Sequence, residues 1–291
     1  MRQVTVGKIW MLALLMAGFV TGCGSTQSST SSTTTASGTP VAPPLGVTAT
    51  FGSFGGGSGT TNQGINTVVS GDIGTTASST LVTGFHDAGP GCTYTETGSN
   101  VGLVKGKIYT AAPPPTVGCP SEGTGTTTAT ATQASVDAIA AWNNLSPASR
   151  PGGSDPGAGQ LGGNVLAPGI YKAAGGSFLI TGTDLTLDAQ GDANALWVFQ
   201  APGSLTVGDA GAPRSVILVN GAQAKNVFWY VGSAATINGA GGGTMVGTII
   251  ANSGVTFSTS GVTAITTLNG RALGLNASVT MVNTVINVPA P

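Results

Sequence analysis

The stretch that most constrains the fold covers residues 185–231, where short apolar segments alternate with turns rich in Gly, Ala and Asp. The clearest segments are 196–199, 216–219 and 227–231. Short runs of β-branched and aromatic residues bounded by turn residues are typical of β-strands. Their close spacing leaves no room for helices, so the stretch predicts a stack of strands around which the rest of the chain is arranged.

The composition excludes several classes of protein. Only 7% of the 291 residues are charged, against about 25% in an ordinary soluble domain, and 48 residues are glycines. This argues against an ordinary helical or α/β enzyme and predicts tight turns and a surface of small side chains and hydroxyls. The formal net charge of −1 excludes the basic surface that nucleic-acid binding needs.

Residues 1–22 have the features of an export signal. Basic residues precede an apolar run over 9–20, which is too short to span a bilayer comfortably. The run ends in Val-Thr-Gly-Cys23, which resembles a bacterial lipobox and implies cleavage before Cys23 and acylation of that residue. Several acyl chains on one residue would hold the protein stably at a membrane. Gly24 stands where Asp would retain the protein at the inner membrane, so we expect an exported lipoprotein at the outer membrane or cell surface. An ordinary secretory signal with an incidental cysteine is the alternative.

Residues 23–44 are rich in Ser, Thr and Pro and lack apolar periodicity, which predicts a flexible tether. The folded domain is expected over 45–291. Within it, the Gly/Pro-rich insertion 87–123 carries Cys92 and Cys119. Because export places them in an oxidising compartment, we expect these two cysteines to form a disulfide.

We expect no metal and no cofactor. The only histidine, His86, has no partner at a ligand spacing, and we interpret it as a loop residue.

One helix is predicted at about 131–145, where Val136, Ile139, Trp142 or Asn143, and Leu145 fall near three- and four-residue spacing. Prolines follow and end it. We expect its apolar stripe to pack along the outside of the strand stack.

From residue 159 to 288 strands follow one another with a loose rhythm of strand, Gly-rich corner and strand. Such a rhythm is typical of a solenoid with coils of roughly 20 residues. One coil cannot bury its inner face alone, so the coils must stack. Side chains alternate along a strand. Leu196 and Val198 should therefore share one side of their strand, and Val227, Trp229 and Val231 should share one side of the next.

Several longer motifs resemble the bacterial and fungal ice-binding proteins. The resemblance spans roughly 45–288 and implies a mostly β fold, a right-handed discontinuous β-solenoid with a single helix packed alongside. The matching motifs are VSGDIG at 69–74, LAPGIY at 166–171, LTLDAQGD at 185–192, WVFQ at 197–200, NGAQ at 220–223, NVFWYVGSAAT at 226–236, GTIIA at 247–251 and NGRAL at 269–273.

These motifs are mostly architectural. We expect Asp188 and Asp192 to accept hydrogen bonds from backbone N–H groups at a turn, Asn226 and Asn269 to act similarly at corners, and Arg271 to tie neighbouring loops.

The resemblance also implies a flat face of short Thr-Ala/Gly-x-Thr/Asn segments on stacked strands, which binds an ice crystal surface. Strand spacing supplies regularity, and Thr carries a methyl and a hydroxyl on a stiff side chain. No clean Thr-x-Thr ladder repeats, and the long segment 258–268 and the insertion 87–123 interrupt the pattern. The candidate ice-binding residues are Thr181, Thr183, Ser233, Thr236, Ser253, Thr256, Thr263, Ser278 and Thr280.

Two other functions compete with ice binding. β-Solenoids also host polysaccharide-cleaving enzymes, but the sequence offers no paired-carboxylate stripe, so we expect no enzyme. A cell-surface adhesion or structural module fits the anchor and tether as well as an ice binder does. In either case we expect a monomer whose membrane contact runs through Cys23.

Overall fold

The computed structural model describes residues 41–89, 93–112 and 123–290. The export signal, Cys23, most of the tether, and both Cys92 and Cys119 lie outside the described residues. No helix within the described part of the chain is long and apolar enough to cross a membrane.

The strands form three sheets, and every pairing is parallel except that of β6 with β7. The largest sheet has thirteen strands: β11 (Gly169–Lys172), β14 (Trp197–Ala201), β17 (Val227–Val231), β19 (Thr244–Ala251), β21 (Thr266–Gly274), β23 (Thr284–Asn287), β3 (Thr67–Val69), β8 (Gly102–Val104), β6 (Phe85–Asp87) and β7 (Thr93–Tyr94) in that order, with β1 (Phe51–Gly55), β4 (Asp72–Ser78) and β9 (Ile108–Ala111) beside it. A second sheet has three strands, β10 (Val165–Leu166), β13 (Leu185–Asp188) and β16 (Val216–Val219). The third has seven: β12 (Phe178–Ile180), β15 (Leu205–Val207), β18 (Ala235–Ile237), β20 (Val255–Phe257), β22 (Val279–Met281), β2 (Thr60–Asn62) and β5 (Val82–Thr83).

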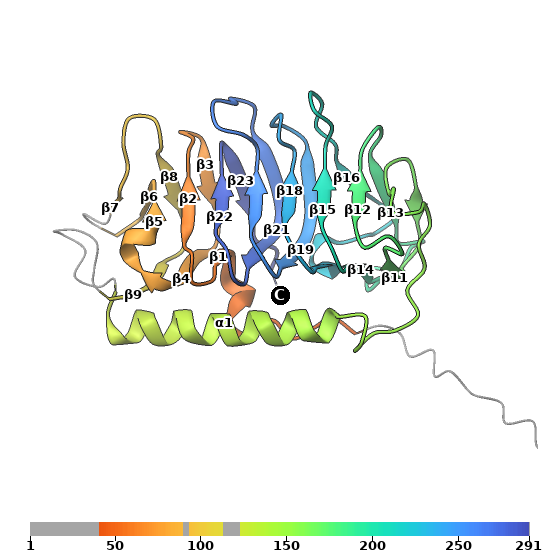
Figure 1. Cartoon of the computed structure of the whole chain (residues 1–291), viewed down its shortest axis with the longest axis horizontal. Coiled ribbons are helices and arrows are strands. Elements are labelled where there is room, and N and C mark those ends of the chain that lie inside the picture. The colour runs from red at the N-terminus through yellow and green to blue at the C-terminus, as the bar shows by residue number, and fades with distance from the viewer. Residues whose placement is uncertain (1–40, 90–92, 113–122, 291) are drawn as a thin grey trace, which may run out of the picture. The chain divides into compact units, whose positions relative to one another are not determined.

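The chain visits these coils out of order, which makes the solenoid discontinuous. Strands β1–β9 build one end, and the helix α1 (Gly125–Leu145) then runs back along the stack (Figure 1). Its first turn contacts β9 through Thr127 Oγ1, which donates to the Thr110 carbonyl (3.1 Å). At its far end the Leu145 carbonyl accepts from Gln200 Nε2 of β14 (2.9 Å). Strands β10–β23 return toward the start, and β23 pairs with β3.

Two hydrophobic cores result. The first fills the coils, where Trp229 stacks on Phe199 with ring centroids 4.0 Å apart. The second lies between the large sheet and α1 and contains Val198 and Phe228. The strands of the large sheet are therefore buried on both faces. The alternation predicted for Leu196/Val198 and for Val227/Trp229/Val231 is confirmed, since the first pair faces α1 and the second set faces the coil interior.

The helix differs from its prediction in extent and in buried face. It begins six residues earlier than the predicted start at 131, at Gly125, because Thr124 caps it by accepting from the Thr127 N–H (3.2 Å). Threonine hydroxyls in the first turns donate to carbonyls four residues back, as Thr128 does to Thr124 (2.8 Å).

The predicted stripe of large apolar residues is wrong for two of its members, since Val136 is 54% exposed and Ile139 is 43% exposed. The buried stripe is made of Ala131, Ala134, Ala138, Ala141 and Leu145. Small side chains let the helix approach the sheet closely, and the bulky residues contributed by the sheet fill the space between them.

Asp188, Asp192 and Arg271 act as predicted. The carboxylates of Asp188 and Asp192 accept from backbone N–H groups two residues ahead, both at 2.8 Å. Arg271 is buried and donates to the carbonyls of Ala49 (2.6 Å) and Pro289 (2.9 Å). Burial lowers the pKa of the Arg271 guanidinium to about 10.

The prediction for Asn269 is wrong, because it lies inside β21 and its Oδ1 accepts from the side chain of Asn287 (3.0 Å). Asn226 lies at a turn, but its side chain donates to the Ala193 carbonyl (3.1 Å).

His86 is not a loop residue, because it lies in β6, where its Nδ1 is 2.6 Å from Glu96 Oε1. The pairing with β7 and β8 gives it a place in the sheet that local sequence does not reveal.

Candidate functional site

One face of the seven-stranded sheet carries a row of threonines, one on each of six neighbouring strands. The strands pair in register without a bulge. Thr206 pairs with Thr236, Thr236 with Thr256, and Thr256 with Thr280. Thr61 pairs with Thr280 on one side and with Thr83 on the other. We call these six residues the Thr row: Thr206, Thr236, Thr256, Thr280, Thr61 and Thr83. The seventh strand, β12, places Leu179 beside Thr206. The strands that carry the row lie side by side in Figure 1.

On each strand, the residues before and after the threonine are buried in the coil, and they hold the backbone at the threonine in place. Thr256, for example, lies between Val255 and Phe257, both completely buried. The row thus consists of side chains that face solvent from a backbone held by the core. Neighbouring strands of a sheet are about 4.8 Å apart, so this spacing repeats along the row.

Thr236 and Thr256 are exposed and the other four threonines of the row are half-buried. Among the described residues, none of the six donates a side-chain hydrogen bond to the protein or accepts one from it. The seven strands of this sheet contain no charged residue. The face is therefore neutral, regular and hydroxyl-bearing.

A second row lies two residues before the first, just ahead of each strand. Its carbonyls accept from the first residue of the neighbouring strand, as Ala234 does from the Leu205 N–H and Gly254 from the Ala235 N–H. Apart from Leu81, the members of this row have small side chains or none. Its members are Ser177, Ser204, Ala234, Gly254, Ser278, Gly59 and, at the end, Leu81.

The structure brings four of the nine sequence candidates together. Thr236, Thr256 and Thr280 are three consecutive members of the Thr row, and Ser278 lies in the second row.

The other five candidates lie outside both rows. Thr181 and Thr183 follow β12 at a corner, where Thr181 Oγ1 accepts from Gln160 Nε2 (2.6 Å). Ser233 and Ser253 lie in the turns that lead into β18 and β20, and Thr263 lies in the loop after β20.

Sequence reasoning missed Thr206, Thr61 and Thr83. Each is the middle or second residue of a very short strand, as in Leu-Thr-Val for β15 and Thr-Thr-Asn for β2. An apolar-Thr-apolar triplet after a Gly- or Ser-containing turn was the available signal for Thr206, as it was for Thr256.

Within the described residues, no cluster of three or more His, Cys, Asp or Glu side chains could hold a metal ion.

Comparison with known proteins identifies the family. A family model described as ice-binding-like matches residues 54–287. The chain belongs to the ice-binding-like family. Its mostly β, discontinuous solenoid fold with one flanking helix is the fold of the solved ice-binding proteins that it resembles.

Relatives within the ice-binding-like family come from diverse organisms. An ice-binding protein of Nostoc sp. (strain HG1) is 40% identical over 198 residues, which are 66% of this chain and 66% of the relative. One of Flavobacterium frigoris (strain PS1) is 32% identical over 145 residues, 50% of this chain and 48% of the relative. The matches therefore span two thirds or less of these relatives' length. The solved DUF3494 domain of ice-binding protein 1 from Shewanella frigidimarina superposes with a TM-score of 0.69 at 26% identity, and covers 87% of this chain and 100% of that one.

Proposed function

We propose that this protein binds ice through the Thr row of its seven-stranded sheet. The observation that carries the proposal is the in-register alignment of six threonines, one per strand, whose hydroxyls make no hydrogen bond within the described part of the chain.

The physical basis is the ordering of water by a rigid, repeating surface. Each Thr offers a methyl that restrains nearby water and a hydroxyl that both donates and accepts. The strand spacing of about 4.8 Å repeats these groups, so the bound water forms an array that can merge with a crystal lattice. The strands of this face carry no charged side chain, so no charge disrupts the ordered water.

The proposal is supported by the names of the relatives, which are ice-binding proteins of bacteria and fungi. It needs a single chain, since all seven strands of the sheet come from one molecule. We therefore propose a monomer, which light scattering of the purified protein would test.

Thermal hysteresis and inhibition of ice recrystallisation test the proposed activity directly. We expect a freezing-point gap, shaped crystals and incorporation of the labelled protein into a growing ice hemisphere. If all three are absent from correctly folded protein, ice binding is refuted, and a cell-surface adhesion or structural role without ice becomes the better hypothesis.

We also propose that the protein is exported and held at the outer membrane or cell surface by acylation of Cys23. The support is the lipobox-like sequence and the Ser/Thr/Pro-rich segment behind it. Labelled palmitate should enter the wild-type protein and not a Cys23→Ala variant. A Cys23→Ala variant that stays in the membrane fraction would refute the anchor.

The pairing of Cys92 with Cys119 is a further proposal, supported by the expected export. Under denaturing, non-reducing conditions we expect neither cysteine to react with a thiol reagent. Labelling of either one contradicts the disulfide.

A further inference from the structure

A notch with a volume of about 750 Å³ opens at the end of the Thr row. Thr61 and Thr83 contribute to its floor, and the loops 97–100 and 260–263 form two of its walls. The turn 63–65 and residues 282–283 complete it. Its volume falls within the range of about 300–1,000 Å³ typical of small-molecule sites.

Buried amide side chains hold the walls in place. Asn283, which is 6% exposed, accepts from the backbone N–H groups of Ile65 (3.1 Å) and Asn66 (3.0 Å) and donates to the Val262 carbonyl (2.7 Å). It therefore joins the 63–65 turn to the 260–263 loop. Asn62 is fully buried and donates to the carbonyls of Gly64 (2.7 Å) and Gly84 (3.0 Å).

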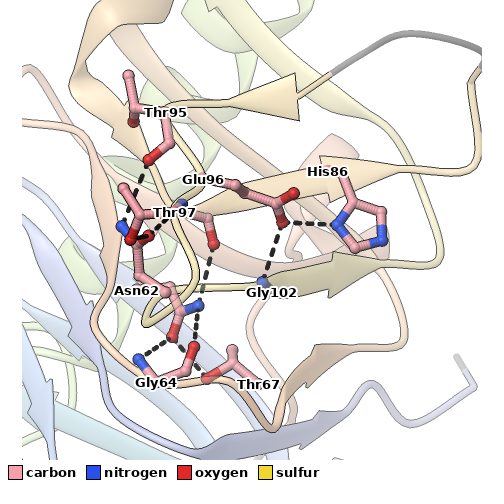
Figure 2. Close-up of polar contacts among 10 residues, drawn as sticks. Asn62, Gly64, Thr67, His86, Thr95, Glu96, Thr97 and Gly102 are labelled. Carbon is pink, nitrogen blue, oxygen red and sulfur yellow. Dashed lines mark hydrogen bonds and ion pairs between the residues drawn. The ribbon is translucent and has the colours of Figure 1, made fainter.

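The 97–100 wall is braced from behind (Figure 2). Glu96 Oε1 accepts from the Gly102 N–H (3.2 Å) and from His86 Nδ1 (2.6 Å). Asn100 Oδ1 accepts from the Thr97 N–H (2.6 Å). These contacts within the protein shape the notch in advance.

The lining of the notch is polar without being charged. No Asp, Glu, Lys, Arg or His lines it. Gln63, Ser260 and Thr263 are exposed, and within the described residues their side chains make no hydrogen bond to the protein. A hydroxyl or an amide both donates and accepts, so a matching ligand must also do both at several neighbouring positions. Ile65, which is 58% exposed, adds an apolar wall together with Val262.

We propose that this notch binds a neutral saccharide, a mono- or disaccharide unit. The hydroxyls of a sugar ring donate and accept around its rim, and its C–H face can pack on Ile65 and Val262. Anionic ligands find no cation in the lining, metal ions find no carboxylate, and flat aromatic ligands find no ring on which to stack. The proposal does not depend on ice binding, although the site shares Thr61 and Thr83 with the Thr row.

Amide NMR of the full chain tests the site. Glucose, N-acetylglucosamine, maltose and cellobiose are titrated separately to about 50 mM, enough to saturate a site with a Kd near 1 mM. Glycerol at the same concentration is the control for a general polyol effect. We expect saturable shifts from at least one sugar at residues 61–65, 97–100 and 260–263.

Two variants assign the shifts to the notch. Gln63→Ala removes an exposed amide and is expected to weaken binding by about tenfold, as the loss of one or two hydrogen bonds implies. Ser260→Trp fills the notch and should abolish the shifts. Gln133→Ala on α1, another exposed glutamine, should leave them unchanged.

The proposal is overturned if no sugar gives saturable shifts, if glycerol reproduces them, or if they centre on Thr206, Thr236 and Thr256. It is also overturned if Ser260→Trp binds like the wild type while giving a folded spectrum. Thermal hysteresis measured on the same samples keeps the outcome separate from ice binding, because a protein without ice activity can still bind a sugar here.

Discussion

Each threonine of the Thr row has a backbone held in place by buried neighbours and a side chain on the outer face of the sheet. Thr256 is exposed while Val255 and Phe257 beside it are completely buried. The strand therefore tolerates changes at Thr256 that leave the core untouched, because surface substitutions of this kind usually change stability by less than about 0.5 kcal/mol.

Thr256→Tyr should remove most of the thermal hysteresis. The tyrosine ring would project from the middle of the row and keep the neighbouring threonines away from a flat ice surface. Tyrosine suits strands, so we expect the unfolding midpoint to remain close to that of the wild type. The matched control is Thr132→Tyr on the exposed face of α1, which should keep full activity. Equal losses in both variants would disconnect the Thr row from ice binding.

Asp155 illustrates how one carboxylate stabilises the end of the stack. It accepts from the backbone N–H groups of Gly159 (2.7 Å) and Ala174 (2.9 Å) and, at 3.4 Å, of Gly157. Burial acts to raise the pKa of Asp155, but these three donors outweigh it and hold the pKa below its ordinary value of 3.8. The charged form is therefore favoured by the fold.

Stability should depend on pH through Asp155. A folded pKa below the unfolded one contributes stability that is complete above the unfolded value and is lost as pH falls through the folded value. Asp155→Asn should lower the free energy of unfolding by about 1–2 kcal/mol near neutral pH. In urea titrations the difference from wild type should shrink as the pH falls below the unfolded pKa. A difference that stays constant with pH would contradict the assignment.

At the scale of single elements, β12 marks the end of the row. It places Leu179, which is 39% exposed, where the other six strands have Thr. The strand itself is held by buried Phe178 and Ile180.

Leu179→Thr should raise thermal hysteresis modestly, because it extends the row from six rungs to seven. Ile217→Thr is the control, since Ile217 is 42% exposed on a strand of the three-stranded sheet. We expect no change of activity from the control. A gain from Ile217→Thr alone would place the active face on that sheet.

Helix α1 packs through alanines, so its distance from the large sheet is set by small side chains. Ala138→Leu should destabilise the protein by about 1–3 kcal/mol, because added methylenes overpack a close contact. Ala140→Leu, at an exposed position of the same helix, should be nearly neutral. Denaturant unfolding of the two variants measures the difference. Equal stability would mean that the helix is loosely held.

At the scale of the whole molecule, the Thr row is assembled from distant parts of the chain. Thr61 and Thr83 come from the coils that precede α1, and Thr206, Thr236, Thr256 and Thr280 from the coils that follow it. The row is continuous because β2 pairs with β22.

Thr61→Tyr should therefore reduce thermal hysteresis to a degree similar to Thr256→Tyr, although the two residues are far apart in sequence. If Thr61→Tyr is fully active, the active face ends at β22. Size-exclusion chromatography and the unfolding midpoint should be unchanged in either case.

The sequence determined the fold class and the family. Short apolar segments with turn residues predicted stacked strands, and the motifs of residues 69–74 to 269–273 predicted a discontinuous solenoid with one helix, as the structure and the family match show. The role of Asp188 was also predictable, because its carboxylate accepts from the N–H of Gln190, two residues ahead in the same turn. The role of Arg271 followed from the resemblance, since its partner Ala49 is distant in the sequence.

Only the tertiary structure decided which threonines share a face. Coils of unequal length separate successive rungs, and α1 interrupts the series, so the row has no fixed period in the sequence. For this reason three threonines of the row are absent from the sequence candidates, and five candidates lie at corners and loops outside it. The same reason explains the misjudged helix face: whether Val136 or Ala138 is buried depends on how close the large sheet comes, and that distance is a property of the packed molecule.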